Sequence, residues 1–271
     1  MSGLRFVTDL AVIKAITANL FKGLLGLWLL LCPCLSFGQG HSNARLGVVF
    51  DLDWTLLNST TQAMVQAEPI NTFQYEGKWY RITYGVAQAI KKLHDQGIEV
   101  SLFSGGTSER NDFAAKIIEQ QVNDLLERRD FKFKQILDLQ DLLVVSQDPQ
   151  ARFADKYKKE LSRFFDIEHT LIVDDMMAFS VKGQEKNLVW LGKTYNDRPR
   201  FELQNIEALE STVYSAPNYD EWIRDRNKIA TAVTDILKAK EIMNQRNISF
   251  PDAFYTVDPY KTKFPMCGNL F

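Results

Sequence analysis

From Arg45 onward, short apolar runs alternate with longer segments whose apolar residues recur at helical spacing. Five runs have the length of buried strands and lie at residues 46–50, 98–103, 142–145, 169–173 and 188–191. Three amphipathic segments separate them, at residues 84–96, 111–126 and 154–165. Strand–helix–strand repetition predicts an α/β, Rossmann-like fold, in which a mostly parallel sheet carries helices on both faces.

Polar clusters directly follow three of the predicted strands. Asp51-Leu-Asp53 follows the first strand, Ser104-Gly-Gly106 the second and Asp174-Asp175 the fourth. In open α/β sheets, ligands bind beyond the carboxyl ends of the strands. We therefore expect these three clusters to lie together at one edge of the sheet.

The two acidic pairs predict a magnesium site. A carboxylate can attack phosphorus only if the repulsion between the two anions is offset, and a divalent metal held by oxygen ligands does this. The predicted ligands are Asp51, Asp53, Asp174 and Asp175. The alternative is that these aspartates only cap the helices that follow.

The cluster after the second strand suits a phosphate oxygen. A hydroxyl at Ser104 and the backbone N–H groups of Gly105 and Gly106 precede a predicted helix, and helix N-termini bind anions. Arg110 is a further candidate for the same anion, with a solvated helix residue as the equal alternative. A phosphoryl site also needs a fixed cation, but spacing does not choose among Lys156, Lys158 and Lys159.

These motifs together resemble the haloacid dehalogenase-like (HAD) phosphatase superfamily. The resemblance covers about residues 46–195 and is carried by Asp51-Leu-Asp-Trp-Thr55, Ser104, a lysine within 156–159, and Asp174-Asp175. Residues 51–59 and 159–163 are similar to the branch of small carboxy-terminal-domain phosphatases, which favours Lys159 as the motif lysine. Residues 83–85 read Thr-Tyr-Gly, where that branch usually has Arg-Pro-Gly.

The resemblance implies a role for each matching residue. Asp51 would be the nucleophile that forms a phosphoaspartate, and Asp53 would act as general acid and then general base. Ser104 would bind a phosphate oxygen, and Lys159 would offset the charge on the nucleophile and the phosphate. Thr55 would support the loop, and we group it with Gly105, Gly106 and Arg110 as substrate-binding.

Segments outside these motifs predict the remaining elements of the fold. Residues 72–82 predict a β-hairpin, which would form a small flap carrying Trp79 and Tyr80, with no large cap domain. Residues 219–246 predict one long amphipathic helix, and 247–271 an irregular tail. We expect a catalytic domain at 45–200 and a C-terminal helical extension at 201–271. An exposed apolar face on that helix would indicate an interaction module in addition to the enzyme.

The N-terminus predicts export. Arg5, Lys14 and Lys22 precede an apolar run at 23–37, so residues 1–38 are interpreted as a secretory signal peptide, with a retained membrane anchor as the alternative. The exported protein would be periplasmic or secreted. Only Cys267 lies beyond the signal, which leaves no intramolecular disulfide.

The charge balance limits the partners. A formal net charge of −2 gives no electrostatic basis for binding nucleic acid. We predict a Mg²⁺-dependent phosphomonoesterase acting on small phosphate esters. The alternatives are a phosphoprotein phosphatase and a non-catalytic protein that binds phosphate or metal, and the sequence does not determine the oligomeric state.

Overall fold

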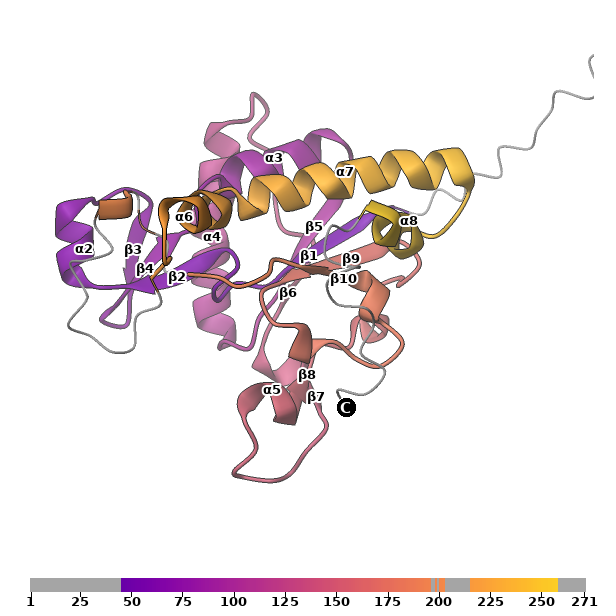
Figure 1. Ribbon diagram of the computed structural model, residues 1–271, viewed down its shortest axis with the longest axis horizontal. Helices are drawn as coiled ribbons and strands as arrows, with labels where there is room; N and C mark the ends of the chain where they lie inside the picture. Colours follow the sequence, from indigo (N-terminus) through magenta and orange to yellow (C-terminus); the bar gives the residue numbers. More distant parts are fainter. Residues whose placement is uncertain (1–44, 196–197, 199, 203–214, 258–271) are drawn as a thin grey trace, which may run out of the picture. The chain divides into compact units, whose positions relative to one another are not determined.

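The structure is a computed structural model that describes residues 45–195, 198, 200–202 and 215–257 (Figure 1). The predicted signal peptide at 1–38 and Cys267 lie outside the described residues. Among the residues described, no helix is long and apolar enough to cross a membrane.

A five-stranded parallel sheet forms the centre and confirms the predicted α/β class. Its strands, in the spatial order β10-β9-β1-β5-β6, are Leu188–Trp190, Thr170–Asp174, Gly47–Phe50, Glu99–Phe103 and Ile136–Leu137. The register aligns Phe50 with Leu102 of β5 and with Val173 of β9. The carboxyl ends of β5, β1 and β9 therefore lie side by side, which brings the three polar clusters to one edge.

Alternation along the strands divides the core into two layers. Val48, Phe50 and Leu102 point into the larger layer, which packs under four helices: α3 (Val86–Asp95), α4 (Ser108–Asp124), α7 (Lys228–Arg246) and α8 (Phe250–Val257). Val49 and Phe103 point into the smaller layer, which short helical turns and the pair of strands β7 (Leu143–Val144) and β8 (Tyr157–Lys158) cover. Figure 1 shows α7 running alongside α3 over the sheet.

A second, antiparallel sheet follows the first strand. It has the order β2-β4-β3 and consists of Leu57–Thr60, Lys78–Ile82 and Thr72–Tyr75, with α2 (Gln62–Ala67) between β2 and β3. The predicted hairpin at 72–82 is confirmed, and β2 adds a strand that the sequence did not indicate. Tyr80 is buried and stacks on Phe73, so the flap has a small core of its own.

The region from 136 to 165 differs from the prediction. The strand beside β5 at the edge of the parallel sheet is β6. The strand expected at 142–145 is not part of that sheet, because Leu143–Val144 (β7) pairs antiparallel with Tyr157–Lys158 (β8). The helix expected at 154–165 is replaced by α5 (Phe153–Lys156), β8 and a 3₁₀ turn, η3 (Leu161–Arg163). The backbone N–H of Lys159 donates to Phe179 O at 2.9 Å, and that of Leu161 to Gln184 Oε1 at 2.9 Å. These hydrogen bonds to distant segments take the place of the hydrogen bonds that a helix at 154–165 would make within itself.

The C-terminal region also differs. The helix expected at 219–246 is broken at Asn227 into α6 (Tyr219–Arg226) and α7. Part of the expected irregular tail is α8, which buries Phe250 and Phe254 and carries Pro251 in its first turn, where a missing N–H costs no hydrogen bond. The apolar face of α7 is buried in the core, which removes the basis for an interaction module. Three further 3₁₀ turns are η2 (Leu139–Asp141), η4 (Met177–Phe179) and η5 (Glu185–Asn187).

Candidate active site

The loop after β1 is a tight turn that presents two aspartates. Leu52 O accepts hydrogen bonds from the backbone N–H groups of Leu56 and Leu57 at 2.9 and 2.7 Å. Trp54 has a φ of 64°, a left-handed conformation that costs about 1–2 kcal/mol for a residue with a side chain. The turn begins at Asp51, directly after β1, and displaces Asp53 from the strand direction, so the two carboxylates have different partners.

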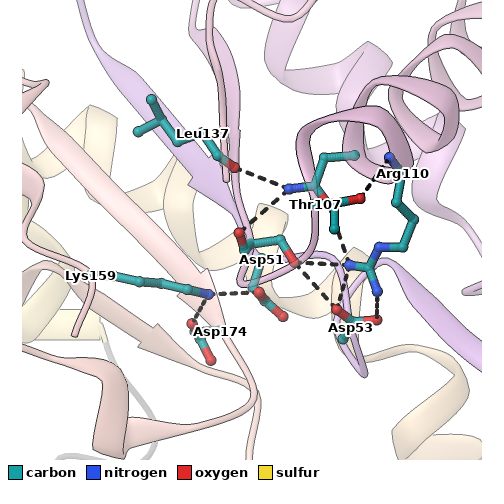
Figure 2. Close-up of polar contacts among 9 residues, drawn as sticks. Asp51, Asp53, Thr107, Arg110, Leu137, Lys159 and Asp174 are labelled. Atoms are coloured by element: carbon teal, nitrogen blue, oxygen red, sulfur yellow. Dashed lines mark hydrogen bonds and ion pairs between the residues drawn. The ribbon is translucent and has the colours of Figure 1, made fainter. Parts of the chain in front are cut away.

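Lys159 joins the first and fourth clusters. Its Nζ donates to Asp51 Oδ1 at 2.6 Å and to Asp174 Oδ2 at 2.7 Å (Figure 2). The three residues are only 4%, 5% and 1% exposed. Burial alone would lower the pKa of Lys159, but Asp174 and Asp51 outweigh burial and raise that pKa, so the ammonium stays charged.

The structure thus chooses among the three candidate lysines. Lys158 donates to the backbone carbonyl of Ala178, and Lys156 lies over the ring of Tyr157 at 5.6 Å from its centroid. Lys159 alone of the three reaches the carboxylates of the site. Lys158 ends β8 and Lys159 directly follows it, and their side chains point in different directions, one to Ala178 O and the other to the carboxylates.

Three carboxylates form a cluster that could hold a metal ion. Ligand atoms of Asp51, Asp174 and Asp175 lie within 4.8 Å of one another. Burial raises the pKa of Asp51, an effect that Lys159 opposes, and burial together with Asp174 raises the pKa of Asp175 to about 7. Carboxylates held this close in a buried site repel one another, and a further cation would offset this repulsion.

The donor set fits Mg²⁺. Its atoms are carboxylate oxygens, the ligands that hard divalent cations prefer. Around the site four carboxylates face two cations, Lys159 and Arg110, which leaves two negative charges for a divalent ion to balance. Asp53, which we expected among the ligands, is not part of the cluster because both of its oxygens face Arg110. None of these aspartates caps a described α-helix, so capping does not explain them.

Arg110 holds Asp53 in a bidentate ion pair. Nη1 donates to Asp53 Oδ1 at 2.9 Å, and Nη2 to Asp53 Oδ2 at 2.6 Å and to Ser104 Oγ at 3.2 Å. Ser104 Oγ also donates to Asp53 Oδ2 at 3.3 Å. Figure 2 shows this group beside the Asp51–Lys159 pair. Arg110 is therefore part of the site and not a solvated helix residue.

The two glycines after Ser104 provide space for side chains. A Cβ on Gly106 would lie 2.4 Å from Nη2 of Arg110 and 2.6 Å from its Cζ. A Cβ on Gly105 would lie 2.8 Å from the ring of Phe153. Gly106 therefore makes room for the guanidinium group, and Gly105 for the aromatic ring. Both positions were expected to bind phosphate through their N–H groups.

We predict that Gly106→Ala lowers turnover about 10- to 100-fold, because the added Cβ displaces Arg110 from Asp53 and Ser104. The backbone at Gly106 does not need a positive φ, so the fold should tolerate alanine. Steady-state kinetics of Gly106→Ala, Arg110→Ala and the double variant measure this. The double variant should be no worse than Arg110→Ala alone; additive losses would contradict a route through Arg110.

Asn111 belongs to the site, and the sequence analysis missed it. Its Nδ2 donates to Ser104 O at 3.4 Å and Leu137 O at 3.2 Å, and its Oδ1 accepts from Arg110 at 3.3 Å. The side chain thus ties β5, β6 and α4 together. One signal was present in the sequence. Asn111 lies on the same buried helix face as Ala115, Ile118 and Val122, where a polar side chain requires hydrogen-bond partners.

Thr55 was grouped with the substrate-binding residues, but the structure buries it completely. Its backbone carbonyl accepts a hydrogen bond from Thr83 Oγ1 at 2.9 Å, and Thr83 in turn accepts one from Asn58 Nδ2 at 3.1 Å. Thr55 is therefore buried within the loop and is not exposed to a substrate. Thr83 and Asn58 are two further supports of the loop that the sequence did not reveal.

Comparisons with known proteins add little to this geometry. No protein-family model matches the chain. No curated protein matches it either. Solved structures of the RNA polymerase II CTD phosphatase Fcp1 are similar, one of them a fission yeast variant bound to beryllium fluoride. Both are 15% identical over 78% of this chain and 70% of theirs, with TM-scores of 0.42 for the beryllium fluoride complex and 0.45 for the other.

Proposed function

We propose that the chain is a magnesium-dependent phosphomonoesterase that works through a phosphoaspartate on Asp51. The observation that supports this best is the buried Lys159, which bonds to both Asp51 and Asp174 next to Asp175. A nucleophile, a fixed cation and a set of metal ligands thereby meet at one point. The order of these residues along the chain also matches the HAD phosphatase motifs.

In this proposal Asp51 Oδ2 attacks phosphorus, because Oδ1 is held by Lys159. The bond from phosphorus to the ester oxygen breaks, and Asp53 gives a proton to the leaving oxygen. Water then attacks the phosphoaspartate while Asp53 accepts its proton, which releases inorganic phosphate and restores Asp51. Bound Mg²⁺ would balance the negative charge and orient the phosphoryl group.

Arg110 and Ser104 would contribute the equatorial contacts. Arg110 presents its guanidinium next to Ser104 Oγ, and a planar guanidinium binds phosphate oxygens bidentately. A substrate phosphate would compete with Asp53 for these donors. Once Arg110 turns toward the phosphate, Asp53 is free to carry the proton for the leaving group.

For the substrate class we propose small phosphate esters met outside the cytoplasm, as the apolar segment at 23–37 suggests. A phosphoprotein is the alternative, since the only insertion described between Asp51 and Ser104 that could cover the site is the small β2–β4 sheet with α2. A panel containing phenyl phosphate, glycerol phosphate and phosphopeptides would separate the two classes.

The test is release of phosphate from p-nitrophenyl phosphate by the purified chain with Mg²⁺ and after chelation. We expect turnover that chelation removes and added Mg²⁺ restores, because the carboxylate cluster needs a divalent cation to accept an anionic substrate. Full turnover without any divalent cation would contradict the proposal. Absence of turnover although Mg²⁺ binds by calorimetry would favour a non-catalytic binding protein.

A further inference from the structure

Lys228, at the first position of α7, is a buried cation that the proposed mechanism does not use. Its side chain is 3% exposed, and burial of an ammonium is costly unless it is paired and hydrogen-bonded. Its Nζ lies 3.3 Å from Asp225 Oδ1 and donates to Trp54 O at 3.0 Å. The second bond spans 174 residues of sequence and ends in the nucleophile loop.

Trp54 directly follows Asp53 in the loop and adopts a conformation that needs support. Its φ of 64° is rare for a bulky aromatic residue. Within the part of the chain that the structure describes, the other non-glycine residues with positive φ are Asn71, Glu76, Arg129 and Asn247. Such a conformation persists only where the surroundings over-determine it. Lys228 supplies one of these constraints by donating to the carbonyl of the strained residue itself.

The loop is thus held from two further sides besides Lys159. Thr83 Oγ1 donates to Thr55 O from the segment before α3, and Lys228 donates to Trp54 O from the start of α7. Lys228 is itself held in place, because Ile229, Val233 and Ile236 of the same helix are buried in the core. A rigid helix therefore determines where the carbonyl of Trp54 lies.

We propose that Lys228 is a positioning residue, through which the C-terminal helix holds the Asp51–Thr55 loop in its working geometry. The effect on catalysis presupposes the phosphatase function proposed above, whereas the effect on the loop does not. On this view the C-terminal extension completes the site, since the loop would otherwise relax around Trp54. Misplacement of a nucleophile by about 1 Å can cost two orders of magnitude in rate.

Removal of Lys228 alone would leave Asp225 buried without its cation, so the test removes both charges. The double variant Lys228→Met/Asp225→Asn takes the donor away from Trp54 O without leaving an unpaired charge. Asp225→Asn alone keeps that donor. Lys240→Met is the matched control, because Lys240 lies on the same helix and donates to another carbonyl, Gln96 O, at 2.6 Å.

Hydrogen exchange of the full chain measures how well the loop amides are protected, without any substrate. The amides of Thr55, Leu56 and Leu57 donate to Leu52 O, so they are protected while the turn is intact. In the double variant we expect peptides covering 52–57 to exchange at least about tenfold faster, with 170–174 unchanged. Lys240→Met should leave both regions as in the wild type. Asp225→Asn keeps the donor to Trp54 O but leaves Lys228 without its carboxylate, so it should loosen 52–57 less than the double variant does.

Kinetics with p-nitrophenyl phosphate then test the effect on the reaction. The double variant should lose about 10- to 100-fold in kcat with KM within about threefold, since the loop carries the nucleophile and not the phosphate-binding Ser104 and Arg110. Unchanged exchange at 52–57, an equal rise at 170–174, or an equal loss of kcat in Lys240→Met would overturn the proposal. If the wild type is inactive but 52–57 still loosens selectively, the phosphatase proposal fails and the role of Lys228 in the loop stands.

Discussion

Replacement of Asp51 by asparagine is expected to lower hydrolysis of p-nitrophenyl phosphate by at least about a thousandfold. The amide retains the size of the side chain and an oxygen that accepts from Lys159, but it cannot form the acyl phosphate that a carboxylate forms. Loss of the nucleophile is among the largest single effects known in enzymes. Phosphate release at saturating Mg²⁺ measures the effect, and circular dichroism checks the fold.

Asp53→Asn is the matched comparison. It changes the other aspartate of the same loop but leaves the nucleophile and its bond to Lys159 intact. With a good leaving group, this variant should still form an acid-trapped phosphoenzyme, which then turns over slowly because water lacks its general base. Asp51→Asn should form none. Turnover that survives Asp51→Asn would refute the mechanism, whatever the activity of Asp53→Asn.

Replacement of Lys159 by methionine is expected to destabilise the fold by about 3–5 kcal/mol in the absence of divalent cations. Its ammonium is the one group described that bonds to both Asp51 and Asp174, and all three side chains are buried. Without it, two carboxylates face each other in a site of low dielectric. Urea unfolding in the presence of a chelator measures the loss.

Magnesium should recover part of that stability, because an ion that binds only the folded chain stabilises it in proportion to the logarithm of its concentration. Lys158→Met is the control: the neighbouring lysine donates to a backbone carbonyl outside the carboxylate cluster, so its loss should cost about 1 kcal/mol. Equal destabilisation by the two variants would show that the charge pairing at Lys159 is not what stabilises the site.

Much of the site could be predicted because parallel strands share an edge. Once the runs ending at Phe50, Phe103 and Val173 are taken as strands of one parallel sheet, the polar residues after them must converge. The structure brings Asp51, Asp53, Ser104, Asp174 and Asp175 together at that edge as this reasoning required.

The errors have a common physical cause. The helix expected at 154–165 and the unbroken helix at 219–246 both follow from local apolar spacing, which does not include hydrogen bonds to distant segments. At 154–165 the bonds from Lys159 N and Leu161 N to residues about 20 positions away replace the helical ones. At Asn227 the chain bends, and Lys228 at the start of the next helix then reaches Trp54.

The sequence by itself determined the fold class, the meeting of the polar clusters at one edge of the sheet and the acidic character of the site, because strand length, alternation and motif spacing are local properties. Tertiary structure decided that Lys159, which the family resemblance only favoured, is the buried cation. It alone decided that Arg110 pairs with Asp53, that Thr55 is buried within the loop, and that Lys228 supports that loop. Each of these depends on a contact between segments far apart in the chain. The distances that define such contacts arise only when the sheet and its helices pack.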